Sequence, residues 1–136
     1  MKRRDFLKDT TALVCLGVAT QVLTDCTKES SVNPKPSANF SIDLEDPKYT
    51  DLKTVGGIVL VNNIYIVCTG QSTYIALSRI CTHAGCSVNY NSSAKTFVCP
   101  CHGGVYNING KVVSGPPPAP LAQYQTVLNG TTLSVS

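Results

Sequence analysis

The chain carries little charge and few histidines. Charged residues make up 14% of the sequence, the net charge is +3, and only two of the 136 residues are histidine. So weak a positive charge, without interleaved basic and aromatic residues, argues against a nucleic-acid-binding protein. The apolar run near the N-terminus, residues 10–24, is too short to span a bilayer, since a transmembrane helix needs about 20 residues. Beyond residue 40 no segment repeats its apolar residues with a helical period, which argues against a helical domain.

Both histidines lie in two short segments that also hold four of the seven cysteines. The first segment reads CTHAGC from residue 81, the second reads CPCHGG from residue 99, and twelve residues separate them. In each segment a cysteine and a histidine stand close enough to bind one metal centre together. These candidate ligands are Cys81, His83, Cys99 and His102. Two thiolates and two imidazoles suit either zinc or an iron–sulfur centre.

Each segment carries one further cysteine, Cys86 in the first and Cys101 in the second. A structural zinc site needs only the four candidate ligands and leaves these two cysteines unexplained. An iron–sulfur site accounts for all six residues. A seventh residue of this chemistry, Cys68, lies in a strongly apolar strand, where a lone cysteine is expected to be a small buried hydrophobe.

The two segments closely resemble the cluster-binding boxes of Rieske proteins. Within that family they are similar to the disulfide-containing branch found in quinol–cytochrome c and plastoquinol–plastocyanin reductases. The resemblance covers the chain from about residue 40 to its end. It implies a 2Fe–2S cluster with Cys81 and Cys99 on one iron and His83 and His102 on the other. It also implies a disulfide between Cys86 and Cys101.

The resemblance extends to residues around the cluster. Tyr106 matches a family tyrosine that donates a hydrogen bond to a ligand cysteine, whereas Gly104 stands where a serine often donates to a bridging sulfur. The implied redox potential lies below that of relatives with both donors, and Gly104→Ser is expected to raise it. Ala84 replaces the leucine usual in quinol-oxidising relatives and gives less apolar cover. Residues 115–120, with Pro116, resemble the proline loop that closes over the cluster.

The expected fold class is all-β, an antiparallel Rieske-type sandwich or barrel with a small cluster-binding subdomain inserted at about residues 79–122 of a domain over 39–136. Alternating and β-branched residues predict strands at 40–44, 58–61, 64–68, 73–77, 88–90, 95–98, 105–106, 111–113, 124–128 and 131–135. Asn62-Asn63 and Asn129-Gly130 are predicted to form two-residue hairpin loops.

Residues 1–26 look like an export signal. Lys2-Arg3-Arg4-Asp5-Phe6 resembles the twin-arginine motif, and a charged start followed by a short apolar run is typical of signal peptides. Residues 23–26 resemble a lipobox, so Cys26 is a candidate for lipidation, and an uncleaved signal acting as an anchor stays open. Residues 27–38, rich in proline and serine, are predicted to be a linker. We expect the domain on the periplasmic face of the membrane or in the periplasm.

The resemblance implies one-electron transfer, as an electron-transfer subunit of an oxidoreductase rather than as a catalyst alone. The leading hypothesis is a component of a respiratory quinol-oxidising complex or of a related membrane or periplasmic oxidoreductase complex. A cytochrome or another subunit would be its redox partner, and quinol is a candidate reductant. It would associate with the membrane through a lipid anchor or through the complex. Three alternatives stay open: the small Rieske subunit of a periplasmic molybdenum oxidase, a dioxygenase ferredoxin, and a structural zinc domain. The cysteine pair and the export signal argue against the ferredoxin.

Overall fold

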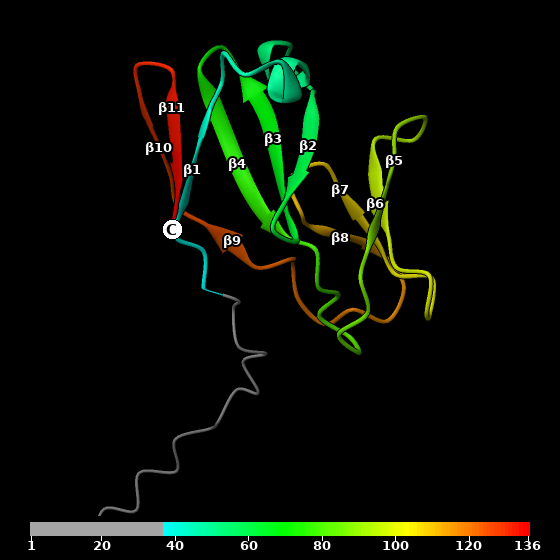
Figure 1. The fold of residues 1–136 in the computed structure, drawn as a ribbon. Helices are drawn as coiled ribbons and strands as arrows, with labels where there is room; N and C mark the ends of the chain where they lie inside the picture. Colours follow the sequence, from blue (N-terminus) through cyan, green and yellow to red (C-terminus); the bar gives the residue numbers. More distant parts are fainter. Residues whose placement is uncertain (1–36) are drawn as a thin grey trace, which may run out of the picture. The chain divides into compact units, whose positions relative to one another are not determined.

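The computed structural model describes residues 37–136, which form three antiparallel sheets and one short helix (Figure 1). The first sheet, in the order β1–β11–β10, contains β1 (Phe40–Asp43), β11 (Thr132–Val135) and β10 (Thr126–Asn129). The second sheet contains β2 (Ile58–Val61), β3 (Ile64–Gly70), β4 (Thr73–Ser78) and β9 (Gln123–Tyr124), in that order. The third contains β5 (Asn89–Asn91), β6 (Thr96–Val98), β7 (Val105–Asn107) and β8 (Val112–Ser114), also in that order. The predicted all-β antiparallel class is confirmed.

The N-terminal predictions fall outside this part of the chain. The export signal, Cys26 and all of the predicted linker except residues 37 and 38 lie outside the described residues. Among residues 37–136, no helix is both long and apolar enough to cross a membrane. The bounds proposed for the domain and for the cluster-binding subdomain remain predictions.

Strand β3 is buried on both faces and separates two hydrophobic cores. Its residues 64–68 are all buried, which explains why the sequence shows an unbroken apolar run there rather than an alternation. Ile64 and Ile66 point into a first core, shared with the first sheet. Tyr65 and Val67 point into a second core, shared with Phe97 of the third sheet. The second core is the one that holds the predicted metal ligands Cys81 and Cys99.

The two predicted tight turns have different outcomes. Val61 pairs with Ile64, so Asn62 and Asn63 form a two-residue loop, and their φ values of 50° and 63° suit the predicted turn. At the C-terminal hairpin Asn129 pairs with Thr132, so the loop is residues 130–131 and the predicted loop, Asn129-Gly130, is wrong by one position. Gly130 has φ 62° and takes the first loop position, where glycine adopts positive φ without steric cost.

A short 3-10 helix, η1 (Pro47–Lys53), was not predicted. The Asp46 side chain caps it by accepting a hydrogen bond from the Lys48 amide, and Pro47 supplies the first helical residue. The helix buries Leu52 in the first core. Seven residues are too few to show a helical period, so only the Asp-Pro pair signalled this element.

Candidate metal centre

Two loops with the same hydrogen-bonding pattern carry the predicted ligands. In the first loop, residues 81–86, the Cys81 amide donates to the Cys86 carbonyl (2.7 Å) and the Gly85 amide donates to the Cys81 carbonyl (3.0 Å). In the second loop, residues 99–104, the Cys99 amide donates to the Gly104 carbonyl (2.7 Å) and the Gly103 amide to the Cys99 carbonyl (3.0 Å). Each loop thereby turns tightly, and Gly85 in the first loop and Gly103 in the second adopt positive φ, at 75° and 71°.

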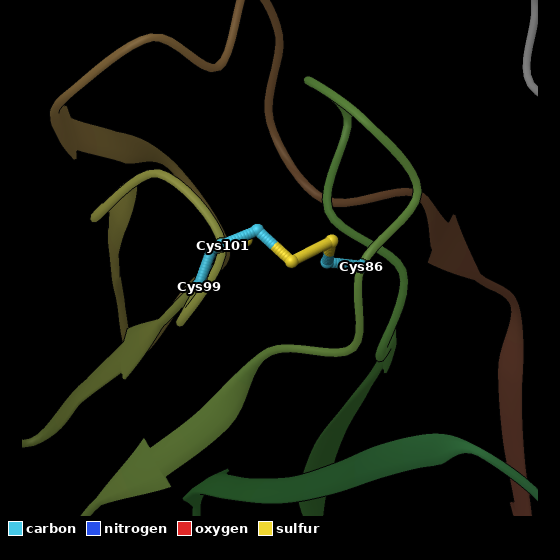
Figure 2. Close-up of side chains that lie close together, drawn as sticks. All are labelled: Cys86, Cys99 and Cys101. Atoms are coloured by element: carbon cyan, nitrogen blue, oxygen red, sulfur yellow. A yellow bond between two sulfur atoms is a disulfide. The ribbon is translucent and has the colours of Figure 1, made fainter.

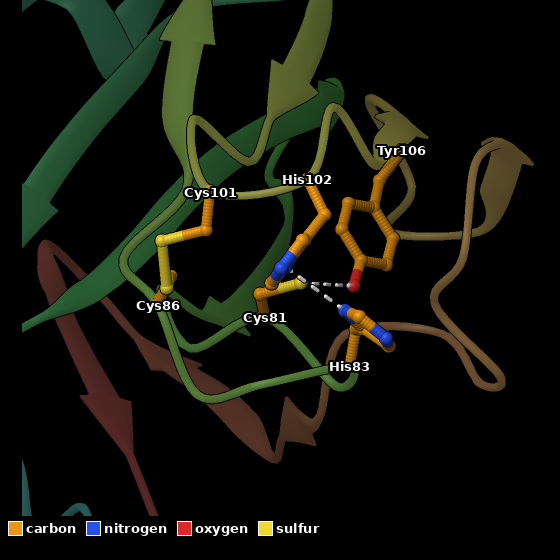
Figure 3. Close-up of a disulfide and its surroundings, with 6 residues drawn as sticks. All are labelled: Cys81, His83, Cys86, Cys101, His102 and Tyr106. Atoms are coloured by element: carbon orange, nitrogen blue, oxygen red, sulfur yellow. Dashed lines mark hydrogen bonds between the residues drawn. A yellow bond between two sulfur atoms is a disulfide. The ribbon is translucent and has the colours of Figure 1, made fainter.

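A disulfide joins the two loops. Cys86 and Cys101 are bonded with an S–S distance of 2.01 Å, so the pairing implied by the family resemblance is present (Figure 3). Cys86 is half-buried and Cys101 is exposed. The bridge fixes the spacing of the two loops, so that the candidate metal ligands of one loop can face those of the other.

The two histidines meet at the exposed side of this arrangement. The Nδ1 atoms of His83 and His102 lie 3.2 Å apart, and the ring planes are nearly perpendicular, at 89° (Figure 3). Two nitrogens bound to one tetrahedral metal ion lie about 3.3 Å apart when each metal–nitrogen bond is about 2.05 Å. The pair therefore fits two imidazole ligands of one metal ion, and both rings are exposed to solvent.

The two predicted cysteine ligands are buried beneath the histidines. Cys81 and Cys99 are each 1% exposed, and neither is in a disulfide. Cys68 is also buried and outside any disulfide, but it lies in the first core. Burial raises the pKa of the Cys81 thiol, but the Tyr106 hydroxyl and the His83 backbone amide hydrogen-bond to its sulfur and lower that pKa overall. A site that favours thiolate suits a metal ligand.

The Cys99 sulfur lies beside the disulfide. The sulfur atoms of Cys86, Cys99 and Cys101 all lie within 4.8 Å of one another (Figure 2). Three cysteine sulfurs at such distances would suit a metal ion, but two of them are consumed by the disulfide. Only Cys99 can offer a thiolate from this group, which is consistent with the pairing of Cys99 with Cys81 as ligands.

Tyr106 and Thr82 form a hydrogen-bonded network around Cys81. The Tyr106 hydroxyl lies 3.3 Å from the Cys81 sulfur and accepts a hydrogen bond from the Thr82 amide (3.1 Å). The Thr82 hydroxyl lies 3.1 Å from the tyrosine oxygen and donates its proton to the Ala119 carbonyl, at 2.6 Å. The Tyr106 hydroxyl can therefore donate its own proton to the Cys81 sulfur or to the Thr82 hydroxyl oxygen. Burial, followed by the contact with Cys81, raises the pKa of Tyr106, so the hydroxyl stays protonated.

Some residues around the centre were not found by sequence analysis. Thr82 connects the first loop to residues 115–120, and Pro117 is buried whereas the predicted Pro116 is exposed. A threonine inside CTHAGC and a second proline in a proline run carry no signal that marks a contact. Arg79, whose guanidinium donates to the Val88 carbonyl (3.2 Å) and to Asn89 Oδ1 (3.0 Å), ties the base of the first loop to β5.

Comparisons with known proteins relate this chain to a family of metal proteins. A family described as Rieske 2Fe-2S domain matches residues 39–125. The cytochrome b6-f complex iron-sulfur subunit of Chlorobaculum thiosulfatiphilum is 39% identical over 71 residues, which are 52% of this chain and 39% of that protein. The chain therefore spans about two fifths of the length of that curated relative.

Two solved structures extend the comparison. The cyanobacterial plasma membrane Rieske protein PetC3 from Synechocystis PCC 6803 is 32% identical, with a TM-score of 0.55, over 74% of this chain and 99% of that chain. A chain of a hyperthermophilic respiratory Complex III is 27% identical, with a TM-score of 0.54, over 71% of this chain and 74% of that chain. Both alignments extend over most of the described residues.

Proposed function

The chain belongs to the Rieske 2Fe-2S domain family, its cofactor is a 2Fe–2S cluster, and we propose that it transfers single electrons within a quinol-oxidising complex. The observation that carries the proposal is the pairing of two buried thiols with two exposed imidazoles across disulfide-linked loops. We assign Cys81 and Cys99 to one iron and His83 and His102 to the other. The structural zinc alternative is set aside, since it has no place in this family.

The ligand set explains what chemistry the site performs. When bound, the cluster accepts and releases one electron, and two neutral imidazoles in place of two thiolates raise its potential into the range of roughly −150 to +300 mV. The exposed rings of His83 and His102 face solvent or a docked partner. They can therefore hold or release a proton at the ring nitrogen that does not bind iron, which suits a hydrogen donor such as a quinol.

The surface near the histidines supports docking in a fixed assembly. Residues 80–94, 96–110 and 112–136 contain no aspartate, glutamate, lysine or arginine. Freely diffusing redox carriers gain association rate from complementary charge, which these segments cannot supply. The absence of charge in the segments that carry the rings suits a partner that is held in place, such as a neighbouring subunit of a membrane complex.

The disulfide supports export. Disulfides persist in oxidising compartments and are rare in the cytoplasm, so Cys86–Cys101 fits a domain that works outside it. Together with the twin-arginine-like sequence of residues 1–26, the disulfide supports the proposal that the domain acts on the periplasmic face of the membrane. Lipidation of Cys26 is the proposed anchor.

Redox titration of the purified full-length protein between pH 6 and pH 9 tests the quinol proposal. We expect a midpoint potential above about 0 mV that falls as the pH rises, because reduction then takes up a proton at the imidazoles. Iron content and the EPR spectrum of the reduced protein identify the cluster independently. A potential near −100 mV that is flat across this pH range would remove quinol oxidation from the proposal and leave a low-potential carrier.

Replacing Tyr106 with phenylalanine should lower the potential. The substitution removes one hydrogen-bond donor from the Cys81 sulfur, and a donor favours the reduced, more negative state. A preference of about 1 kcal/mol for that state corresponds to about 40 mV for a one-electron couple. Titration of the variant beside Tyr90→Phe, on a tyrosine of β5, supplies the control. An unchanged potential in Tyr106→Phe would mean that the tyrosine proton goes to Thr82.

A further inference from the structure

The backbone conformation at Gly104 does not require a glycine. The residue is buried, and its φ does not lie in the left-handed region, unlike that of the neighbouring Gly103 (71°). The space around it explains the residue. A Cβ atom at this position would lie 2.5 Å from Cγ and 2.8 Å from Cδ of Pro117, closer than real Cβ contacts allow. The pyrrolidine ring cannot rotate away as a flexible side chain would.

Residues 115–117 rest directly on the second loop. Gly115 has φ 93°, and a Cβ there would lie 2.8 Å from the Gly104 Cα and 3.1 Å from the Gly103 carbonyl oxygen. Two glycines therefore let the two backbones touch, and the buried ring of Pro117 fills the space where a residue-104 side chain would be. The other end of the same segment is tied to the first loop through the Ala119 carbonyl and Thr82.

The filled space lies next to a proposed ligand. The same Cβ position at residue 104 is 3.7 Å from the Cβ of Cys99. A hydroxyl group carried there would stand beside the Cys99 side chain, and hydrogen-bond donors to the sulfur atoms of iron–sulfur centres raise their potential. Proline carries no donor, not even a backbone N–H. The ring thus places apolar atoms where a hydrogen-bond donor could stand.

We propose that Pro117 is a positioning residue for the metal centre, whose ring occupies the space from which a residue-104 side chain could donate a hydrogen bond beside Cys99, and so holds the redox potential down. The proposal rests on the assignment of Cys99 as a ligand. It changes the expectation for Gly104→Ser, since a serine added alone collides with the ring and cannot place its hydroxyl. A rise in potential requires that Pro117 be removed as well.

Thermal unfolding of the full-length holoprotein tests the contact itself. Gly104→Ala should lower the Tm by several degrees in the wild-type background and by clearly less in a Pro117→Ala background, where the clashing ring atoms are gone. In a background of Pro116→Ala, the matched change at the exposed neighbour, the loss should equal that in the wild type. Equal losses in all three backgrounds would refute the contact, as would a Gly104→Ala/Pro117→Ala protein that does not fold.

Redox titration and EPR test the effect on the centre. The Gly104→Ser/Pro117→Ala protein should have a higher midpoint potential than Gly104→Ala/Pro117→Ala, which has the same Cβ without the hydroxyl. Equal potentials in this pair would overturn the tuning role even if the unfolding data show the contact. If the wild-type protein holds no 2Fe–2S cluster, the proposed function fails, whereas the unfolding comparison still decides whether Pro117 excludes a side chain at residue 104.

Discussion

Replacing Cys99 with serine should remove nearly all iron from the purified protein, while the same substitution at Cys68 should leave the iron content unchanged. Both cysteines are buried and unbonded, so they differ in location and not in exposure. Cys99 lies in the second core with Cys81, and Cys68 lies in the first core, where its thiol contacts the Gly70 carbonyl at 3.3 Å. A hydroxyl is a far weaker ligand for iron than a thiolate, so iron should be lost only when the replaced cysteine is a ligand.

The measurement is iron and acid-labile sulfide per chain, together with visible absorbance. Cys81→Ser should behave as Cys99→Ser does, because the two are assigned to the same iron. Circular dichroism establishes that each variant retains its strands. Full iron content in Cys99→Ser would show that the four-residue ligand set is wrong. Loss of iron in Cys68→Ser, in a folded protein, would mean that the first core takes part in the site.

The sequence predicts most of this fold because its strands and turns depend on local signals. Every predicted strand is present, although the one predicted at 124–128 is divided into β9 and β10, which belong to different sheets. The Asn62-Asn63 loop has the positive φ values that asparagine tolerates. The Asn129-Gly130 loop was misplaced because either of two adjacent registers uses the same glycine, and the observed register is the one that pairs Leu128 with Leu133 across the hairpin. The helix η1 was not predicted because seven residues are too few to show a helical period.

The same distinction between local and long-range contacts applies to the metal centre. The segments CTHAGC and CPCHGG identify the cysteines and histidines as candidate ligands, because the cysteine and histidine of each pair lie close together in the sequence. The contacts of Thr82 with Ala119 and of Gly104 with Pro117 join residues 37 and 13 positions apart, and nothing in either pair marks it as a contact. The family resemblance predicts that residues 115–120 close over the centre, but which of them touch each loop depends on how the segment packs there.

Replacing both Cys86 and Cys101 with serine should cost about 3 kcal/mol of unfolding free energy, the value expected when a cross-link closes a loop of about 15 residues. The double variant avoids leaving a reactive single thiol, and urea unfolding measures the loss. Cluster retention should suffer more than the fold. Each loop keeps its own backbone hydrogen bonds, but nothing covalent then holds His83 opposite His102.

The rate of iron loss to a chelator separates these two effects. We expect the double variant to release iron much faster than the wild type at urea concentrations where both remain folded, because opening of the loops no longer requires unfolding of the sheets. Cys68→Ser again serves as the matched control for loss of a sulfur atom. Iron release at the wild-type rate would mean that the cluster itself, together with the Thr82–Ala119 and Gly104–Pro117 contacts, suffices to hold the loops. The disulfide would then contribute to the stability of the fold and not to retention of the cluster.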